Sequence, residues 1–576
     1  MSVTRAVIEQ RLRHAFDALE PGADPVLRAS DHADFQANGA LALAKRLGRN
    51  PREVAEEVCR TAALDDVCRS VEVSGPGFVN LTLADSFVAT QLDAMASDER
   101  LSVPAADDPQ TVVVDYSAPN VAKEMHVGHL RSTIIGDALV RTLEYMGHRV
   151  VKENHVGDWG TPFGMLIEHL LDLGEEKAVE ELSVGDLDTF YRQARASFDA
   201  DPAFQERSRR RVVALQSGDE ETLRLWRVLV AQSVRYFDEV YTKLDVLLTD
   251  EDIVGESFYN PMLAETVAQL DRQGLLVESE GALCVFPPGF TNRNGDPLPL
   301  IVQKSDEGYG YATTDLAAIR DRVGRIGAQR ILYVVGAPQA QHFGMCFATA
   351  RLAGWLPADD TAVHVAFGSV LGADRKMFRT RAGDTVKLGD LLDEAVARAD
   401  AAIAERDPQL EAGARAPVAR AVGIGAVKFA DLSTDRVKDY VFDWDRMLAF
   451  EGFTGPYLQY AYARIRSIFR RAGDLDADRW PHAPFPLGEQ AERDLALALL
   501  AFPDALDAVL EGFAPSRLCA YLYDVASAFA TFFENCPVLQ APGDELRQGR
   551  LRLADLTGRV LAQGLALVGI TAPERM

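Results

Sequence analysis

The apolar and polar positions between residues 111 and 151 follow the pattern of a strand, a helix and a second strand. Residues 111–114 form a β-branched apolar run, as in a buried parallel strand. Apolar residues then recur at helical spacing over 130–146, and Gly147 follows where a helix would end. Residues 150–151 begin another apolar run. We therefore predict a β-loop-α-β unit whose loop spans 115–129.

A different pattern precedes this unit. Residues 1–10 have the apolar spacing of an amphipathic helix, and residues 71–83 alternate as two strands around a Gly-Pro-Gly turn. Residues 102–109 have the composition of a linker. The sequence therefore predicts a small α+β N-terminal domain over residues 1–105.

The remainder divides into two further regions. Residues 106–395 alternate strand and helix patterns, which indicates an α/β domain, with an acidic helical insertion at about 170–300. Residues 396–576 are helical throughout by pattern, which indicates an all-α C-terminal domain. We predict an α/β fold class for the chain as a whole.

The loop at 115–129 carries a candidate phosphate site. A helix N-terminus offers free N–H groups and partial positive charge, and Gly128 allows close approach to the backbone. His126 and His129 can donate hydrogen bonds to phosphate oxygens as charge develops there. A pair of surface histidines without a role is the alternative for the bare His-x-Gly-His pattern.

Composition limits the other possibilities. No apolar run reaches membrane-spanning length, and the N-terminal pattern is not that of a signal peptide, so we expect a cytoplasmic protein. The six cysteines form no Cys-x-x-Cys pair, so we expect reduced thiols and no protein-bound metal. The net charge of −26 is opposite to that of most nucleic-acid binders, and only ten of the 60 basic residues are lysines. We interpret this composition as halophile-like.

A longer motif favours a functional role for the two histidines. It runs from Asp115 to Asp137 and is followed by Asn154-His155-Val156-Gly157-Asp158-Trp159-Gly160-Thr161. It resembles the class I aminoacyl-tRNA synthetases and, among them, the arginyl-tRNA synthetases, whose HIGH signature corresponds to residues 126–129. The resemblance implies a Rossmann-like catalytic domain that joins arginine to ATP and then to the 3′ end of tRNA. Mg²⁺ would arrive with ATP.

The resemblance also implies the ligands of both small substrates. Arginine would be bound by Asp115, Asn120, Tyr311, Asp315 and Gln339. ATP would be bound by His126, Gly128, His129, Lys376 and Met377. Because guanidinium is planar and always charged, carboxylate and hydroxyl acceptors suit it. The KMSKS signature is matched only partly by residues 376–380, with Arg379 in place of the second lysine. Lys123, just before the histidines, would share the catalytic role of Lys376 and Arg379.

The two outer domains would hold tRNA in the same reading. Phe78 and Asn80 match an aromatic-x-amide pair that contacts a D-loop base, where the alternative for Phe78 is a place in the core. Tyr457, Arg464 and Met576 would belong to the anticodon-binding domain. We expect a monomer. Rival functions are a nucleotidyltransferase without RNA, a non-catalytic tRNA-binding protein, and another class I synthetase.

Overall fold

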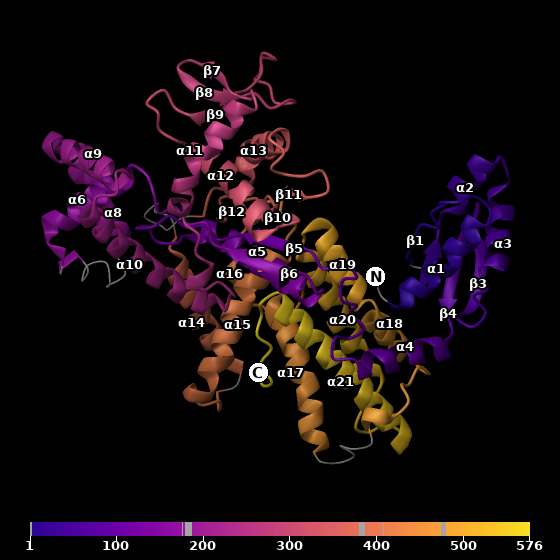
Figure 1. Cartoon of the computed structure of the whole chain (residues 1–576). Coiled ribbons are helices and arrows are strands. Elements are labelled where there is room, and N and C mark those ends of the chain that lie inside the picture. The colour runs from indigo at the N-terminus through magenta and orange to yellow at the C-terminus, as the bar shows by residue number, and fades with distance from the viewer. Residues whose placement is uncertain are drawn as a thin grey trace.

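The computed structural model describes residues 3–30, 32–175, 177–178, 187–378, 386–406, 408–473 and 480–576. In Figure 1 the first domain lies at the right edge, the sheet of the catalytic domain near the centre, and the C-terminal helices below that sheet. Within the described residues, no helix combines the length and apolarity needed to cross a bilayer.

The N-terminal domain is a four-stranded antiparallel sheet with helices on one face. The strand order is β1-β2-β4-β3. Asn50 caps α3 with its side chain and Pro51 opens the helix, as that pair of residues favours. Val79, Leu81 and Leu83 are buried on the helical side. The elements are α1 (Val3–Asp17), β1 (Leu27–Ala29), β2 (Phe35–Ala37), α2 (Ala40–Leu47), α3 (Pro51–Thr61), β3 (Cys68–Ser74), β4 (Phe78–Leu83) and α4 (Asp85–Ser97).

The central sheet is parallel, with order β11-β10-β5-β6. The predicted β-loop-α-β unit is confirmed as β5, α5 and β6. Gly136 lets α5 pack on Tyr116, because a Cβ there would lie 2.3 Å from the Tyr116 ring carbon. The elements are β5 (Thr111–Asp115), α5 (Val127–Tyr145), β6 (Arg149–Glu153), α12 (Tyr311–Asp321), η2 (Arg322–Ile326), β10 (Arg330–Tyr333), η3 (Ala337–Gln339), α13 (Ala340–Leu352), β11 (Thr361–His364) and β12 (Val370–Leu371).

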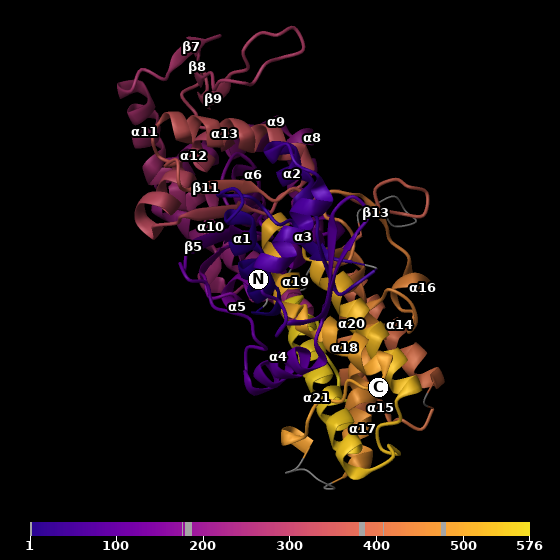
Figure 2. The same cartoon turned by 90° about the vertical axis from the view of Figure 1, so that its right-hand side faces the viewer.

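Helices and a small antiparallel sheet lie between β6 and α12. The sheet, β7-β8-β9, projects at the top of both whole-chain views (Figures 1 and 2). The elements are α6 (Pro162–Leu173), α8 (Leu187–Ala200), α9 (Pro202–Gln216), α10 (Glu220–Leu244), η1 (Asp250–Asp252), α11 (Glu256–Arg272), β7 (Val277–Ser279), β8 (Ala282–Val285) and β9 (Leu300–Gln303).

The C-terminal part is helical, with one exception to the predicted pattern. Tyr440–Val441 form a short strand that pairs in parallel with β12 and so joins this part to the catalytic domain. The elements are α14 (Leu388–Arg406), α15 (Ala412–Leu432), β13 (Tyr440–Val441), α16 (Trp444–Met447), α17 (Gly455–Ala472), η4 (Trp480–His482), α18 (Gln490–Leu500), α19 (Phe502–Gly512), α20 (Ser516–Asn535) and α21 (Asp544–Leu567).

Buried arginines join the three parts. Arg131 on α5 pairs with Asp431 on α15 at 3.1 Å, and both side chains are almost completely buried. Arg493 on α18 is 5% exposed and donates to the carboxylates of Asp34 and Asp85 and to the carbonyl oxygen of Leu83. Because a buried arginine that loses its partners costs several kcal/mol, these contacts fix the domains relative to one another.

Candidate active site

The loop between β5 and α5 has a strained backbone held by side chains from elsewhere. Ser117, Ala118 and Ala122 all have positive φ, at 72°, 47° and 59°, which costs about 1–3 kcal/mol each. Their N–H groups donate to Ser132 Oγ at 2.9 Å, Asn154 Oδ1 at 3.0 Å and Ser233 Oγ at 2.9 Å. Such strain persists where the surroundings over-determine it, and it gathers at functional sites.

The two histidines cap the helix that follows. His126 Nδ1 accepts from the Gly128 N–H at 3.0 Å, and His129 Nδ1 accepts from the His126 N–H at 3.0 Å. With both Nδ1 atoms accepting, each neutral ring carries its proton on Nε2 and has that N–H to donate. A Cβ at Gly128 would lie 2.7 Å from the His126 ring. Glycine therefore permits this ring position.

Burial favours the neutral form of both rings. It lowers the pKa of His126, and it lowers the pKa of His129 to about 3, with the neighbouring His126 adding to the effect. Lys123 lowers both pKa values as well, so its charge lies close to the pair. The Lys123 ammonium stands 4.5 Å from the centre of the Tyr191 ring. The predicted residues Lys123, His126, Gly128 and His129 are thus brought together.

The segment around Lys376 is an exposed turn. The Gly372 N–H donates to the Lys376 carbonyl at 2.8 Å, and Met377 is 54% exposed. Phe378 stacks on Phe442 at 4.7 Å and anchors the turn, which accounts for an aromatic residue at that position of the signature. Arg379 lies outside the described residues.

Residues 386–388 lie beside the loop that carries the two histidines. The Val127 N–H donates to the Val386 carbonyl at 3.1 Å, and the Leu388 N–H donates to the Met125 carbonyl at 2.8 Å. Lys387 pairs with Glu124 at 2.9 Å. Residues 386–388, where the described chain resumes after Phe378, therefore contact the phosphate loop.

Asp315 occupies the first turns of α12 and is held by α13. His342 Nε2 lies 2.5 Å from Asp315 Oδ2, and Cys346 Sγ lies 3.7 Å from the same ring nitrogen. His342 lies in the first turn of α13. Tyr311, the first residue of α12, is 75% exposed. It shares its helix with Asp315 but stands in solvent.

Sequence analysis missed a third carboxylate near Asp315, that of Glu256. We call the group of Asp158, Glu256 and Asp315 the acidic pocket. Burial, then the charges of Asp158 and Asp315, raise the pKa of Glu256 at the start of α11 to about 7. A partly buried acid whose charge is repelled by two others is suited to meet a cation. Glu256 lies about a hundred residues after the Val156-Gly157-Asp158 motif, so the sequence around the motif did not predict it.

Asp115 forms an ion pair inside the protein. Its carboxylate accepts from Arg322 at 2.8 Å, and Arg322 is completely buried between Asp115 and Glu153. Asp115 is itself only 4% exposed. The Arg322 contact uses Asp115 Oδ2, and the arginine-binding role of Asp115 stays a prediction.

The other two predicted arginine ligands, Asn120 and Gln339, lie in the loop between β5 and α5 and at the end of η3. The side chain of Asn120 faces Gly157, where a Cβ would lie 2.2 Å from its Oδ1. Gln339 precedes α13 and is exposed, and its side chain does not cap the helix. Both residues follow the carboxyl ends of neighbouring strands, β5 and β10, where open α/β sheets bind ligands.

The predicted tRNA contacts fall on two separate surfaces. Asn80 on β4 accepts from Gln36 at 2.7 Å and donates to Ser74 at 3.0 Å, with Phe78 two residues away on the same face. Arg464 on α17 lies over the rings of Tyr460 and Phe533.

A hollow of about 570 Å³ on the helical part includes Arg464, Phe533 and Met576 in its lining. The Tyr457 ring stands 5.6 Å from that of Tyr523. Aromatic faces beside arginines suit unstacked bases.

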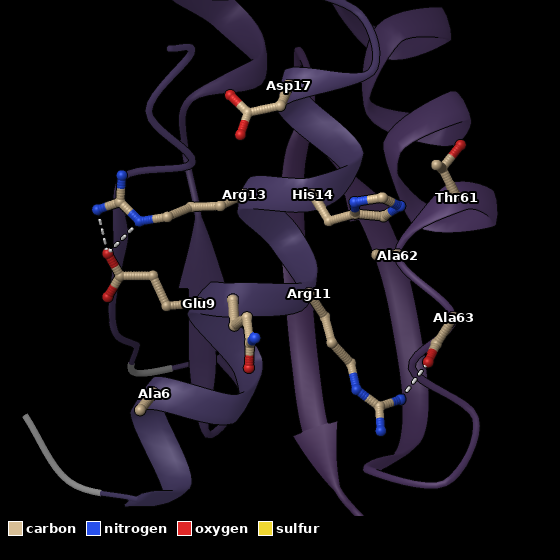
Figure 3. A pocket seen from close by; sticks show the side chains of 10 residues that line it. Ala6, Glu9, Arg11, Arg13, His14, Asp17, Thr61, Ala62 and Ala63 are labelled. Atoms are coloured by element: carbon tan, nitrogen blue, oxygen red, sulfur yellow. Dashed lines mark hydrogen bonds and ion pairs between the residues drawn. The ribbon is translucent and has the colours of Figure 1, made fainter. Parts of the chain in front are cut away.

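A further hollow of about 860 Å³ lies on the N-terminal domain, between α1 and the end of α3 (Figure 3). Glu9 pairs with Arg13 one turn along α1, and Arg11 donates to the Ala63 carbonyl after α3. Its lining comes from helices and not from the strand that carries Phe78 and Asn80. This hollow is therefore distinct from the base-reading face.

Family models match the chain in three stretches. The model described as tRNA synthetases class I (R), catalytic domain, matches residues 91–444. The DALR anticodon binding domain matches 458–576, and the arginyl tRNA synthetase N-terminal domain matches 3–83.

Curated relatives and solved structures agree with these models. An arginine–tRNA ligase of Thermobifida fusca is 55% identical over 99% of this chain and 98% of its own length. One of Shigella sonnei is 48% identical over 99% and 100%. The arginyl-tRNA synthetases of Plasmodium falciparum and Thermus thermophilus align with all of this chain and 99% and 100% of theirs. Their TM-scores are 0.86 and 0.81, at 29% and 27% identity.

Proposed function

Because the chain belongs to the arginyl-tRNA synthetases and is an arginine–tRNA ligase, we propose that the β5–α5 loop and the acidic pocket of Asp315 and Glu256 are its active site. The arginine carboxylate attacks the α-phosphorus of ATP, pyrophosphate leaves, and a terminal ribose hydroxyl of tRNA then takes the arginyl group. The observation that carries this proposal is the pair of neutral imidazoles capping α5, with both Nε2–H groups available to phosphate.

On the phosphate side the protein supplies position and hydrogen bonds. His126 and His129 donate to phosphate oxygens as charge develops, and Gly128 lets the nucleotide approach the backbone. Lys123 and Lys376, with Arg379 and Met377 on the same segment as Lys376, hold the leaving pyrophosphate. This role is supported by the closeness of Lys123 to the histidines and by the return of the Lys376 segment beside His126.

On the arginine side the carboxylates select the guanidinium. Asp315 keeps one oxygen on His342 and presents the other to the substrate, and Glu256 meets the remaining positive charge. Tyr311 adds a hydroxyl from the same helix, and Asn120 and Gln339 bind the amino and carboxylate end. A neutral analogue such as citrulline would leave the acids unpaired, which penalises it by about 10⁴-fold or more.

The outer domains bind tRNA in this proposal. Phe78 and Asn80 read a base at the corner of the tRNA, and Tyr457, Arg464 and Met576 contribute to the anticodon surface. We divide the chain at residues 105 and 395, with an insertion at about 170–300. The boundary at 105 is supported by the separate N-terminal sheet, and the change to helices begins with α14 at Leu388, a few residues before 395.

The remaining assignments concern ion, assembly and location. We propose that Mg²⁺ enters with ATP. In support, the described residues contain one cluster with ligand spacing, and it lies at Asp315, not at the phosphate loop. We further propose a monomer that works in the cytoplasm.

Exchange of pyrophosphate into ATP tests the active site. The enzyme should exchange with arginine but not with lysine or citrulline, and parallel assays with and without tRNA decide whether tRNA is needed for activation. Asp315→Asn should lower kcat/KM for arginine by about 10³-fold, the cost of losing one partner of a desolvated ion pair. Asp321→Asn on the same helix, which removes a pair with Arg325, is the matched control. Equal exchange by both variants would refute the pocket.

A further inference from the structure

Three side chains beside the arginine pocket converge on one point. Asp315 comes from α12, while His342 and Cys346 lie one turn apart on α13. Their ligand atoms all lie within 4.8 Å of one another. One ring nitrogen, His342 Nε2, faces both the Asp315 carboxylate and the Cys346 sulfur.

We propose that Asp315, His342 and Cys346 form a site for Zn²⁺ or a similar thiophilic cation, and that the bound ion competes with arginine. A carboxylate, an imidazole and a thiolate are the ligand types that zinc accepts. Three protein ligands leave a fourth position for water. The competition rests on the proposed role of Asp315, since one carboxylate cannot serve both cations.

The distances need little change for this ion. Zinc bond lengths place a sulfur and a nitrogen ligand about 3.6 Å apart and a nitrogen and an oxygen about 3.3 Å apart in a tetrahedron. The observed separation of Cys346 Sγ and His342 Nε2 is 3.7 Å. The His342–Asp315 contact of 2.5 Å must open by less than 1 Å, which a small rotation of the carboxylate provides.

The site is reachable from one side. Cys346 is completely buried, whereas the side chains of His342 and Asp315 are 29% and 16% exposed. Binding replaces the Asp315–His342 hydrogen bond with bonds to the ion. The proton held between His342 Nε2 and Asp315 and the thiol proton of Cys346 both leave to solvent as the bonds to zinc form, and no oxidation is involved.

Cobalt provides a spectroscopic test that does not depend on activity. Co²⁺ added to the free enzyme should give thiolate-to-cobalt charge-transfer absorption at one equivalent, and Zn²⁺ should abolish it. Cys346→Ser and Cys346→Ala should both lose this absorption, while Cys519→Ala, which alters another buried thiol, should keep it. Thermal unfolding establishes that each variant is folded. Absorption that survives in folded Cys346→Ser, or that never appears in the unaltered enzyme, overturns the site.

Kinetics test the competition separately. In pyrophosphate exchange at fixed excess MgATP, zinc should raise KM for arginine and leave kcat unchanged. Cys346→Ser should need at least about ten times more zinc for the same inhibition, equivalent to one lost ligand. If cobalt requires Cys346 but zinc does not compete with arginine, the metal site stands and the assignment of Asp315 to arginine fails.

Discussion

The two halves of the proposed active site differ in how burial affects their charge. At the β5–α5 loop burial lowers the pKa of both histidines, so the phosphate side works with neutral donors and fixed backbone. In the acidic pocket burial raises the pKa of Glu256 to about 7, so the arginine side retains a carboxylate that titrates near neutrality. Burial acts alike on both, because it disfavours charge. The two substrates differ in charge. ATP is an anion that needs hydrogen-bond donors, whereas the positive charge of arginine favours the ionised form of the carboxylates in the acidic pocket.

The largest effect should come from the neutral half. His126→Ala or His129→Ala should each lower kcat by about 10²–10³-fold, as the loss of one preorganised donor does elsewhere. KM for arginine should stay nearly constant, and the loss in His129→Ala should be the same at pH 6 and pH 8, because burial lowers the pKa of His129 to about 3 and its ring does not change charge in that range. Stopped-flow measurement of adenylate formation gives both values. His482→Ala, in η4, serves as the control. A loss that grows between these pH values would mean that a charged imidazole is the active form.

Removing the charge of Glu256 in the acidic pocket should have the next largest effect. Glu256→Gln should raise KM for arginine about 30-fold at pH 8, which corresponds to about 2 kcal/mol of lost charge pairing. At pH 6 the unaltered enzyme is largely protonated at Glu256, so the two proteins should differ only a few-fold. Calorimetry of arginine binding in buffers of different ionisation heat should detect close to one proton released at pH 6 and almost none at pH 8. Proton release that persists in Glu256→Gln would assign the titration elsewhere.

The charged form of Glu256 favours arginine binding but lowers the stability of the free enzyme. Its pKa in the folded protein, about 7, exceeds its ordinary value of 4.5, so the folded state binds the proton more tightly than the unfolded state. Stability of the free enzyme from this group is full below about pH 4.5 and falls as pH rises through 7. Glu256→Gln should therefore raise the melting temperature at pH 8 and change it little at pH 5. Saturating arginine should raise the melting temperature of the unaltered enzyme more than that of the variant.

Removing either lysine should have a smaller effect on the rate than removing a histidine. Lys123→Ala and Lys376→Ala should each slow adenylate formation about tenfold, or about 1.4 kcal/mol of barrier. Tyr191→Leu, which removes the ring under Lys123 but keeps the charge, is the control for the first variant. If either lysine variant stays within about threefold of the unaltered rate, less than about 0.7 kcal/mol, its role in holding pyrophosphate is refuted.

Salt should have the smallest effect. At about 2 M salt the Debye length is below about 3 Å, so repulsion between a chain of net charge −26 and tRNA is screened. Aminoacylation should then stay within about twofold of its value in dilute buffer, and the paired acids of the pocket should keep their selectivity. Activity that disappears above this concentration would refute the halophile-like interpretation.

Local pattern was sufficient for the phosphate half of the site and not for the arginine half. The strand, loop and helix that hold His126 and His129 are continuous in sequence, so periodicity and a terminal glycine predicted them. Asp115 depends on Arg322, 207 residues away, and no periodicity reports such a pairing. Glu256 opens a helix in the insertion, where its acidic character was indistinguishable from that of a solvated face. The His342–Cys346 spacing of four was visible, but only folding brings Asp315 against it.

The contacts of Arg493 bear on how the enzyme measures its RNA. This one side chain holds two segments of the N-terminal sheet against α18, so the face that carries Asn80 cannot swing independently of the helices that carry Arg464. The span between these two reading surfaces is therefore a fixed length, set by protein packing. Under the proposed function, a tRNA whose corner and anticodon stand at another separation cannot contact both surfaces at once, whatever bases it presents.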